Sequence, residues 1–148
     1  MKILALDPGL STGWSIWEGK QLTAFGTLVS TRPNFSELYS WLSTLDKNFD
    51  LVICERYIIR PRTAGGFDHS WNSGYTLQII GAIKSWAFQH NVKIVEQNSD
   101  IKKPAHAWAF GTPYKKKKNQ HHIDSMLHAI YYMVKQLNMS PKEFRRET

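Results

Sequence analysis

Two short apolar runs, far apart in the sequence, each end directly at a carboxylate. Residues 2–6 (Lys-Ile-Leu-Ala-Leu) stop at Asp7, which opens an Asp-Pro-Gly turn, and residues 51–54 (Leu-Val-Ile-Cys) stop at Glu55. Short apolar runs bounded by turn residues are typical of buried strands. A charge at the end of a buried strand must leave the core or meet a cation. If the two strands are parallel neighbours, both carboxylates lie at one sheet edge, where open α/β sheets bind ligands.

The spacing of apolar residues along the rest of the chain predicts further strands and helices. The predicted strands lie at residues 2–6, 13–18, 21–29, 51–54 and 92–96. The predicted helices lie at residues 35–47, 73–89 and 120–137. This order predicts one α/β domain over residues 1–148 with a mixed five-stranded sheet flanked by helices, in which the first three strands form an antiparallel meander.

Three segments carry no such periodicity. The composition of residues 56–72 predicts a long mobile loop, and loops of this length in small domains are often functional. Residues 98–119 are polar and lysine-rich, and residues 138–148 predict a frayed, charged tail.

Composition narrows the class of partner and the compartment. The formal net charge of +7 favours a polyanionic partner. The single cysteine, Cys54, is expected to be a small buried apolar residue in a reducing compartment. No apolar run approaches the roughly 20 residues of a membrane span, and the early Asp7 does not fit a signal peptide. We therefore expect a cytoplasmic protein with no membrane partner.

Two further polar residues point towards the same sheet edge. Asp124 lies in the first turn of the last predicted helix, and His121 lies one turn earlier. Gathered carboxylates repel by several kcal/mol at an effective dielectric constant of about 20 unless a cation joins them. Oxygen-rich ligation with one imidazole favours Mg²⁺ or Mn²⁺. Each residue alone has an ordinary interpretation, as a turn residue, a solvated strand end or a charge at a helix terminus, but their joint placement favours a metal site.

Three motifs resemble those of the RuvC family of Holliday-junction resolvases. The segment Asp-Pro-Gly-Leu-Ser-Thr-Gly-Trp from Asp7 resembles the opening motif, and residues 52–55 resemble the second acidic strand. The segment from His121 to Ser125 resembles the H-x-x-D-A motif, with Ser125 in place of Ala. The match spans nearly the whole chain, and the small size is similar to that of bacteriophage-encoded members. It implies an RNase H-like fold and metal-dependent cleavage of four-way DNA junctions by a homodimer, in recombination, repair or phage DNA debranching.

The resemblance also implies the residues that do the chemistry. Asp7, Glu55, His121 and Asp124 would be catalytic metal ligands for two Mg²⁺ ions, for which Mn²⁺ would substitute. Our hypothesis is that Asp7 bridges both ions, Glu55 holds one, and His121 with Asp124 holds the other. His128, one turn beyond Asp124, is expected to support the site from behind or to pack in the core.

With the DNA substrate that the resemblance implies, the loop at residues 56–72 and basic residues around the site are expected to contact DNA. A run of lysines is usually a solvated loop, but the absence of acidic residues between positions 101 and 123 favours phosphate binding. Where the family often has an aromatic residue near the junction centre, this chain has Ile58, so Tyr57, Phe67 or Trp71 would take that role. The expected DNA-binding residues are Arg56, Tyr57, Arg60, Arg62, Lys102, Lys103, Lys115, Lys116, Lys117 and Lys118.

The predicted helix at residues 73–89 is apolar on more than one face. One face belongs to the core, and the other is a candidate dimer surface because Gly81 and Ala82 permit close approach. The alternative is a helix wholly buried in a monomer.

Other functions fit parts of the pattern. An RNase H-like flap or rRNA-processing nuclease would keep the fold and change the substrate, and a non-catalytic junction-binding protein would keep only the basic surface. An ATPase of the actin or sugar-kinase type shares the strand that opens with Asp-x-Gly. It needs a second domain, for which 148 residues leave no room.

Overall fold

The computed structural model describes residues 1–31, 34–59 and 71–145, with residues 71–73 described by their backbone alone. The strands are β1 (Lys2–Asp7), β2 (Ser11–Glu18), β3 (Gln21–Val29), β4 (Leu51–Glu55) and β5 (Lys93–Gln97). The helices are α1 (Ser36–Thr44), α2 (Trp71–Gln89), α3 (Lys102–Phe110) and α4 (His121–Gln136). Two 3₁₀ turns, η1 (Ser99–Ile101) and η2 (Pro141–Phe144), complete the described elements.

The strands form one mixed sheet in the order β3-β2-β1-β4-β5. The first three strands pair antiparallel, whereas β4 pairs parallel to β1 and β5 pairs parallel to β4. This arrangement confirms the expected mixed five-stranded sheet and antiparallel meander. It also shows that β1 and β4 are parallel neighbours, the condition for a shared edge, with Leu6 opposite Cys54.

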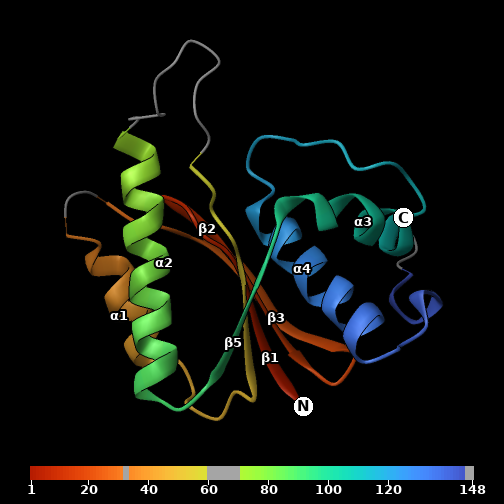
Figure 1. Ribbon diagram of the computed structural model, residues 1–148, viewed down its shortest axis with the longest axis horizontal. Coiled ribbons are helices and arrows are strands. Elements are labelled where there is room, and N and C mark those ends of the chain that lie inside the picture. The colour runs from red at the N-terminus through yellow and green to blue at the C-terminus, as the bar shows by residue number, and fades with distance from the viewer. Residues whose placement is uncertain (32–33, 60–70, 146–148) are drawn as a thin grey trace.

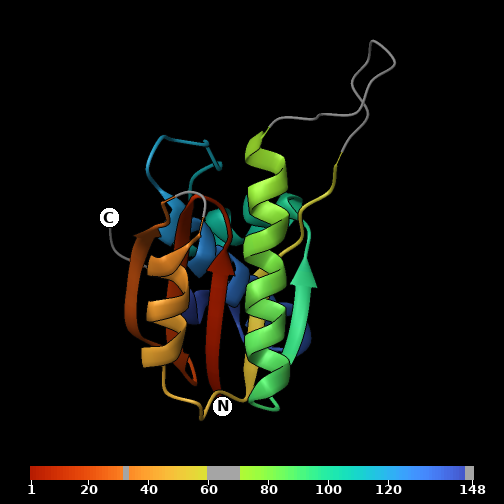
Figure 2. The same cartoon turned by 90° about the vertical axis from the view of Figure 1, so that its left-hand side faces the viewer.

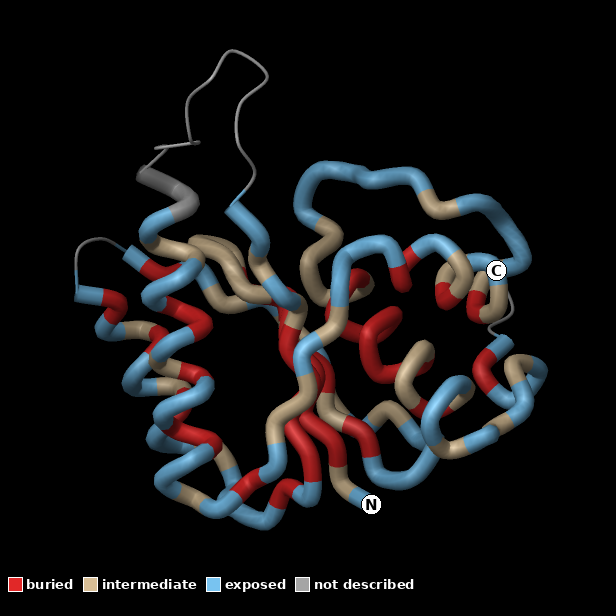
Figure 3. The backbone as a smooth tube through the Cα atoms, in the orientation of Figure 1, coloured by how far each residue is buried: buried red, intermediate tan, exposed pale blue. Residues whose placement is uncertain are grey.

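Helices cover both faces of the sheet, with α1 and α2 on one side and α3 and α4 on the other (Figure 1, Figure 2). Alternate residues of a strand point to opposite faces. In β1, Leu4 and Leu6 therefore join the core beneath α1 and α2, and Ile3 and Ala5 join the core beneath α3 and α4. The central strands are the most buried part of the backbone (Figure 3). Cys54 is fully buried on the α1 and α2 side, as expected.

The helix α3 was not predicted, because residues 98–119 show no apolar stripe. Its buried residues are Lys102, Ala105 and Ala109, two small side chains and a lysine. Pro104 lies in the first turn, where a missing backbone N–H costs no helical hydrogen bond. The expected order of elements therefore lacked one helix, at residues 102–110.

The expected frayed tail is also wrong for residues 138–145. Ser140 and Glu143 form a capping box at the start of η2. Phe144 is 5% exposed and packs edge-on against Trp17, with ring centroids 6.3 Å apart. The tail therefore closes the core beneath α4.

In the predicted loop at residues 56–72, residues 60–70 lie outside the described part, and Trp71 already begins α2.

The long helix α2 has one buried face and one exposed face. Ile79, Ile83 and Ala87 are fully buried against the sheet, whereas Leu77 is 40% and Phe88 is 84% exposed.

Among the helices within the described ranges, none has both the length and the apolarity needed to cross a membrane.

Candidate metal centre at the sheet edge

The carboxylates of Asp7 and Glu55 lie side by side at the ends of β1 and β4. Because Leu6 is opposite Cys54, the next residue of each strand is Asp7 or Glu55, and both strands end at the same edge. Strand alternation places both side chains on the face covered by α3 and α4. Asp7 is 7% exposed, so its charge is held away from bulk water.

The first turns of α4 bring His121 and Asp124 to these carboxylates. His121 Nδ1 lies 3.0 Å from Asp7 Oδ2, and Asp124 is 3% exposed. The hydrogen bond with Asp7 raises the pKa of His121, although partial burial opposes the shift. The structure therefore brings together all four residues expected to be metal ligands.

Lys102 lies among the carboxylates rather than on the surface where DNA binding was expected. Its Nζ is 2.9 Å from Asp7 Oδ1, 2.5 Å from Glu55 Oε2 and 3.2 Å from Asp124 Oδ2. Burial alone lowers the pKa of Lys102, but the three negative charges outweigh it and raise the pKa above its ordinary value. Lys102 is thus a buried ammonium that neutralises part of the site.

His128 supports Glu55 from inside the protein. It is fully buried, with Nε2 2.8 Å from Glu55 Oε2 and Nδ1 2.9 Å from Gln97 Oε1. Since a carboxylate only accepts hydrogen bonds, Nε2 must carry a proton and donate it. Burial raises the pKa of Glu55, but the His128 hydrogen bond and the Lys102 charge lower it to about 2. Glu55 is therefore a fixed, ionised carboxylate.

Two residues that sequence reasoning missed hold Asp124. The hydroxyl of Tyr114 lies 3.1 and 3.2 Å from the two Asp124 oxygens, and Gln120 Nε2 donates to Asp124 Oδ1 at 3.2 Å. Burial, followed by the charge of Asp124, raises the pKa of Tyr114 to about 12. The phenol therefore stays protonated and donates to the carboxylate.

The residues present fit a divalent cation. Oxygens of Asp7, Glu55 and Asp124 already converge on one positive group, Lys102 Nζ. Ligand atoms of Asp7, Glu55 and His128 also lie within 4.8 Å of one another. Because the His128 proton faces Glu55, the donor set remains mostly oxygen, which suits Mg²⁺ or Mn²⁺.

The expected DNA-binding residues are distributed around this edge. Arg56, Lys103 and the four lysines 115–118 are exposed or partly exposed, whereas Tyr57 is half-buried against the core beneath α1 and α2. Arg60, Arg62, Phe67 and the Trp71 side chain lie outside the described residues.

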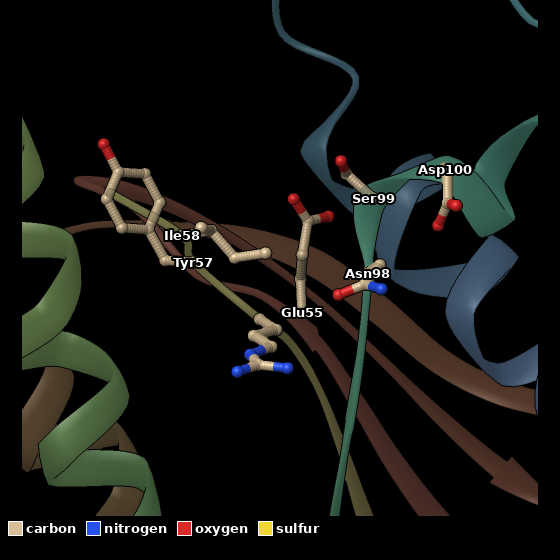
Figure 4. A pocket seen from close by; sticks show the side chains of 7 residues that line it. Glu55, Tyr57, Ile58, Asn98, Ser99 and Asp100 are labelled. Atoms are coloured by element: carbon tan, nitrogen blue, oxygen red, sulfur yellow. The ribbon is translucent and has the colours of Figure 1, made fainter. Parts of the chain in front are cut away.

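An open pocket of about 430 Å³ lies beside Glu55. The Glu55 carboxylate stands between Ile58 and Ser99 at its wall, and Asn98 and Asp100 lie on the β5 side (Figure 4). Ile58 is 50% exposed. The pocket thus combines an ionised carboxylate, an apolar side chain and several hydrogen-bonding groups.

The sheet order and the acidic edge define an RNase H-like fold, which solved structures share over nearly the whole chain. A structure of T. thermophilus RuvC in complex with Holliday junction substrate has a TM-score of 0.65 at 15% identity, covering 93% of this chain and 96% of that one. A second Thermus thermophilus RuvC structure has a TM-score of 0.62 at 16% identity, with 93% and 97% coverage. The fowlpox virus Holliday junction resolvase has a TM-score of 0.56 at 20% identity, with 90% and 97% coverage.

The fold of this chain is therefore the one seen in these RuvC and fowlpox resolvase structures. No protein-family model and no curated protein matches the sequence.

Proposed function

We propose that this protein is a metal-dependent endonuclease that resolves four-way DNA junctions. The observation that carries the proposal is the convergence of Asp7, Glu55 and Asp124 on one cation position at the sheet edge. Mutual repulsion makes such a cluster unfavourable unless a cation is part of its function. The fold shared with two junction resolvases supports the choice of substrate.

Asp7, Glu55, His121 and Asp124 would hold two Mg²⁺ ions, and Mn²⁺ would substitute. Such ions activate water and neutralise the charge that develops on the phosphate and the leaving oxygen. Asp7 lies close to both Glu55 and His121, which suits a ligand shared by both ions. His128 orients Glu55, so that this ligand is fixed before substrate arrives.

The lysine segment 115–118 is flanked on both sides by residues that hydrogen-bond the site. Tyr114 precedes it and Gln120 follows it, and both residues hydrogen-bond Asp124. The exposed segment therefore begins and ends beside a metal ligand, and its ammonium groups would draw backbone phosphates towards the site. Lysine charge carries no base information, so selectivity for the branch would come from its shape.

Ile58 is suited to contact bases at the junction centre. It is 50% exposed and lines the pocket beside Glu55, where the resemblance expects an aromatic residue. Apolar side chains of this kind insert between bases whose stacking is disturbed. Tyr57, on the same strand extension, would contribute its half-exposed ring.

We also propose a homodimer formed through α2. Leu77, Gly81 and Phe88 are exposed at helical spacing, and a Cβ atom on Gly81 would meet nothing within 4 Å in the described chain. A two-fold dimer would place two sites on the two-fold junction. Sedimentation should show a dimer that Phe88→Glu disrupts, and a monomeric wild-type protein would exclude this arrangement.

Cleavage of a substrate panel tests the function. Four-way junctions, flaps, linear duplexes and RNA are incubated with Mg²⁺, and nick positions are mapped on each strand. Paired nicks placed symmetrically across the junction support the proposal. Preference for flaps or RNA would instead identify another RNase H-like nuclease, and binding without any cleavage would identify a non-catalytic junction-binding protein.

A further inference from the structure

We infer that Lys102 is a built-in counter-cation, which occupies the metal position in the metal-free protein and must leave it when a divalent ion binds. This inference rests on the proposed metal-dependent function. It adds that a side chain of the same protein competes with the divalent ion for the carboxylates.

The contacts of Lys102 match those of a cation at the centre of the site. An ammonium has three N–H donors, and three carboxylates, those of Asp7, Glu55 and Asp124, lie 2.5–3.2 Å from Nζ. The side chain is 8% exposed, so no water shell competes with these contacts. A divalent ion bound by the same oxygens, at the shorter distances that Mg²⁺ requires, would occupy the volume that Nζ now fills.

Electrostatics make the two occupants exclusive. With Lys102 in place, three carboxylate charges meet one positive charge, so the ligands remain gathered without metal. A divalent ion neutralises the same carboxylates more completely, but the nearby ammonium would repel it. Metal loading therefore requires Lys102 Nζ to move away from at least one carboxylate.

An open pocket borders Glu55, one of the three carboxylates that Lys102 Nζ contacts. Lys102 is the first residue of α3 and directly follows η1. The open pocket beside Glu55 is lined by the residues around η1, including Asp100 (Figure 4). The flexible four-carbon stem of the lysine allows the ammonium to be displaced without moving the helix.

Metal binding in the absence of DNA tests the inference. Isothermal titration of Mn²⁺ is compared between wild type, Lys102→Met and Lys103→Met, the last replacing the exposed lysine that follows on the same helix. We expect Lys102→Met to bind Mn²⁺ at least about tenfold more tightly and Lys103→Met to match wild type. Equal or weaker binding by Lys102→Met would overturn the inference while leaving the proposed nuclease intact. Absence of Mn²⁺ binding by every protein would contradict both.

A second measurement uses the wild-type protein alone, so its result does not depend on whether the variant folds correctly. Lysine acetylation is followed by mass spectrometry with and without saturating Mg²⁺. Lys102 should be protected in the metal-free protein and become reactive when Mg²⁺ binds, whereas Lys103 should react in both states. Equal protection of Lys102 in both states would show that it does not leave the site.

Discussion

Gly13 lies directly beneath His121, so close that a Cβ atom on Gly13 would come within 1.8 Å of the His121 carbonyl oxygen. Gly13 also pairs with Asp7 across β2 and β1. One position therefore sets how near the start of α4 approaches the end of β1. The distance between the helix-borne and strand-borne ligands depends on the absence of a side chain there.

Replacing this glycine should damage both stability and the metal site. In Gly13→Ala, α4 must shift away from β2, at a cost of about 2 kcal/mol in the free energy of unfolding, and Mn²⁺ should bind more weakly. Urea denaturation and Mn²⁺ titration measure the two effects. Gly74→Ala is the control, since a Cβ atom there meets nothing within 4 Å in the described chain. A fully stable Gly13→Ala with native metal affinity would show that this contact does not set the site.

His128 should act on metal affinity through Glu55. In His128→Leu, Glu55 loses its buried donor and Gln97 loses its partner. We expect Mn²⁺ affinity to fall by about ten- to a hundredfold. The matched control is His122→Leu on the same helix, because His122 stacks on Phe25 and contacts no ligand in the described part of the chain. An unchanged affinity in His128→Leu would reduce His128 to a packing residue.

Metal binding should weaken in acid because of His121. Its pKa is raised in the metal-free protein, chiefly by the hydrogen bond with Asp7, so the imidazolium is favoured, whereas a metal needs the neutral ring. The charged contact stabilises the metal-free protein below the ordinary pKa of about 6.5, and this stabilisation disappears as pH rises through the raised pKa. Mn²⁺ affinity should thus increase from about pH 6 to about pH 8.

The variant His121→Asn should flatten this dependence, measured by titration at each pH. Wild-type and variant profiles of the same steepness would assign the pH dependence to another group.

The lysine segment should govern the salt dependence of junction binding. Replacing Lys115–Lys118 by serine should reduce the slope of log affinity against log salt by roughly 0.9 for each duplex phosphate that the variant no longer neutralises. Lys47→Ser is the control, because Lys47 lies in the turn before β4, at the opposite edge of the sheet. Equal slopes for wild type and the quadruple variant would place the phosphate-binding cations elsewhere.

The sequence predicted the sheet and its acidic edge for a clear reason. Apolar runs that end at Asp7 and Glu55 carry both the strand signal and the position of the charge, and helical periodicity places Asp124 one turn from His121. These signals are local, so they do not depend on knowing the tertiary contacts. The parallel pairing of β1 with β4 was the condition for the shared edge, not a consequence of these signals, and the structure shows it.

The features that were missed depend on tertiary contacts. Lys102 resembles its exposed neighbour Lys103 in sequence, and only the α3 backbone turns it inward. The buried face of α3 consists of Ala105, Ala109 and that lysine, so the sequence has no stripe of large apolar residues from which the helix could be predicted. Phe144 is a single large apolar residue in a charged segment, too little to predict that the tail packs on the core.

Cleavage by Asp7→Asn tests most directly whether the gathered carboxylates perform the reaction. The substitution keeps the size of the side chain and removes the charge on the ligand that lies near both Glu55 and His121. With Mg²⁺, the variant should produce no nicks in a four-way junction, while its affinity for the same junction in Ca²⁺ stays close to that of wild type. Cleavage at the wild-type rate would contradict the account.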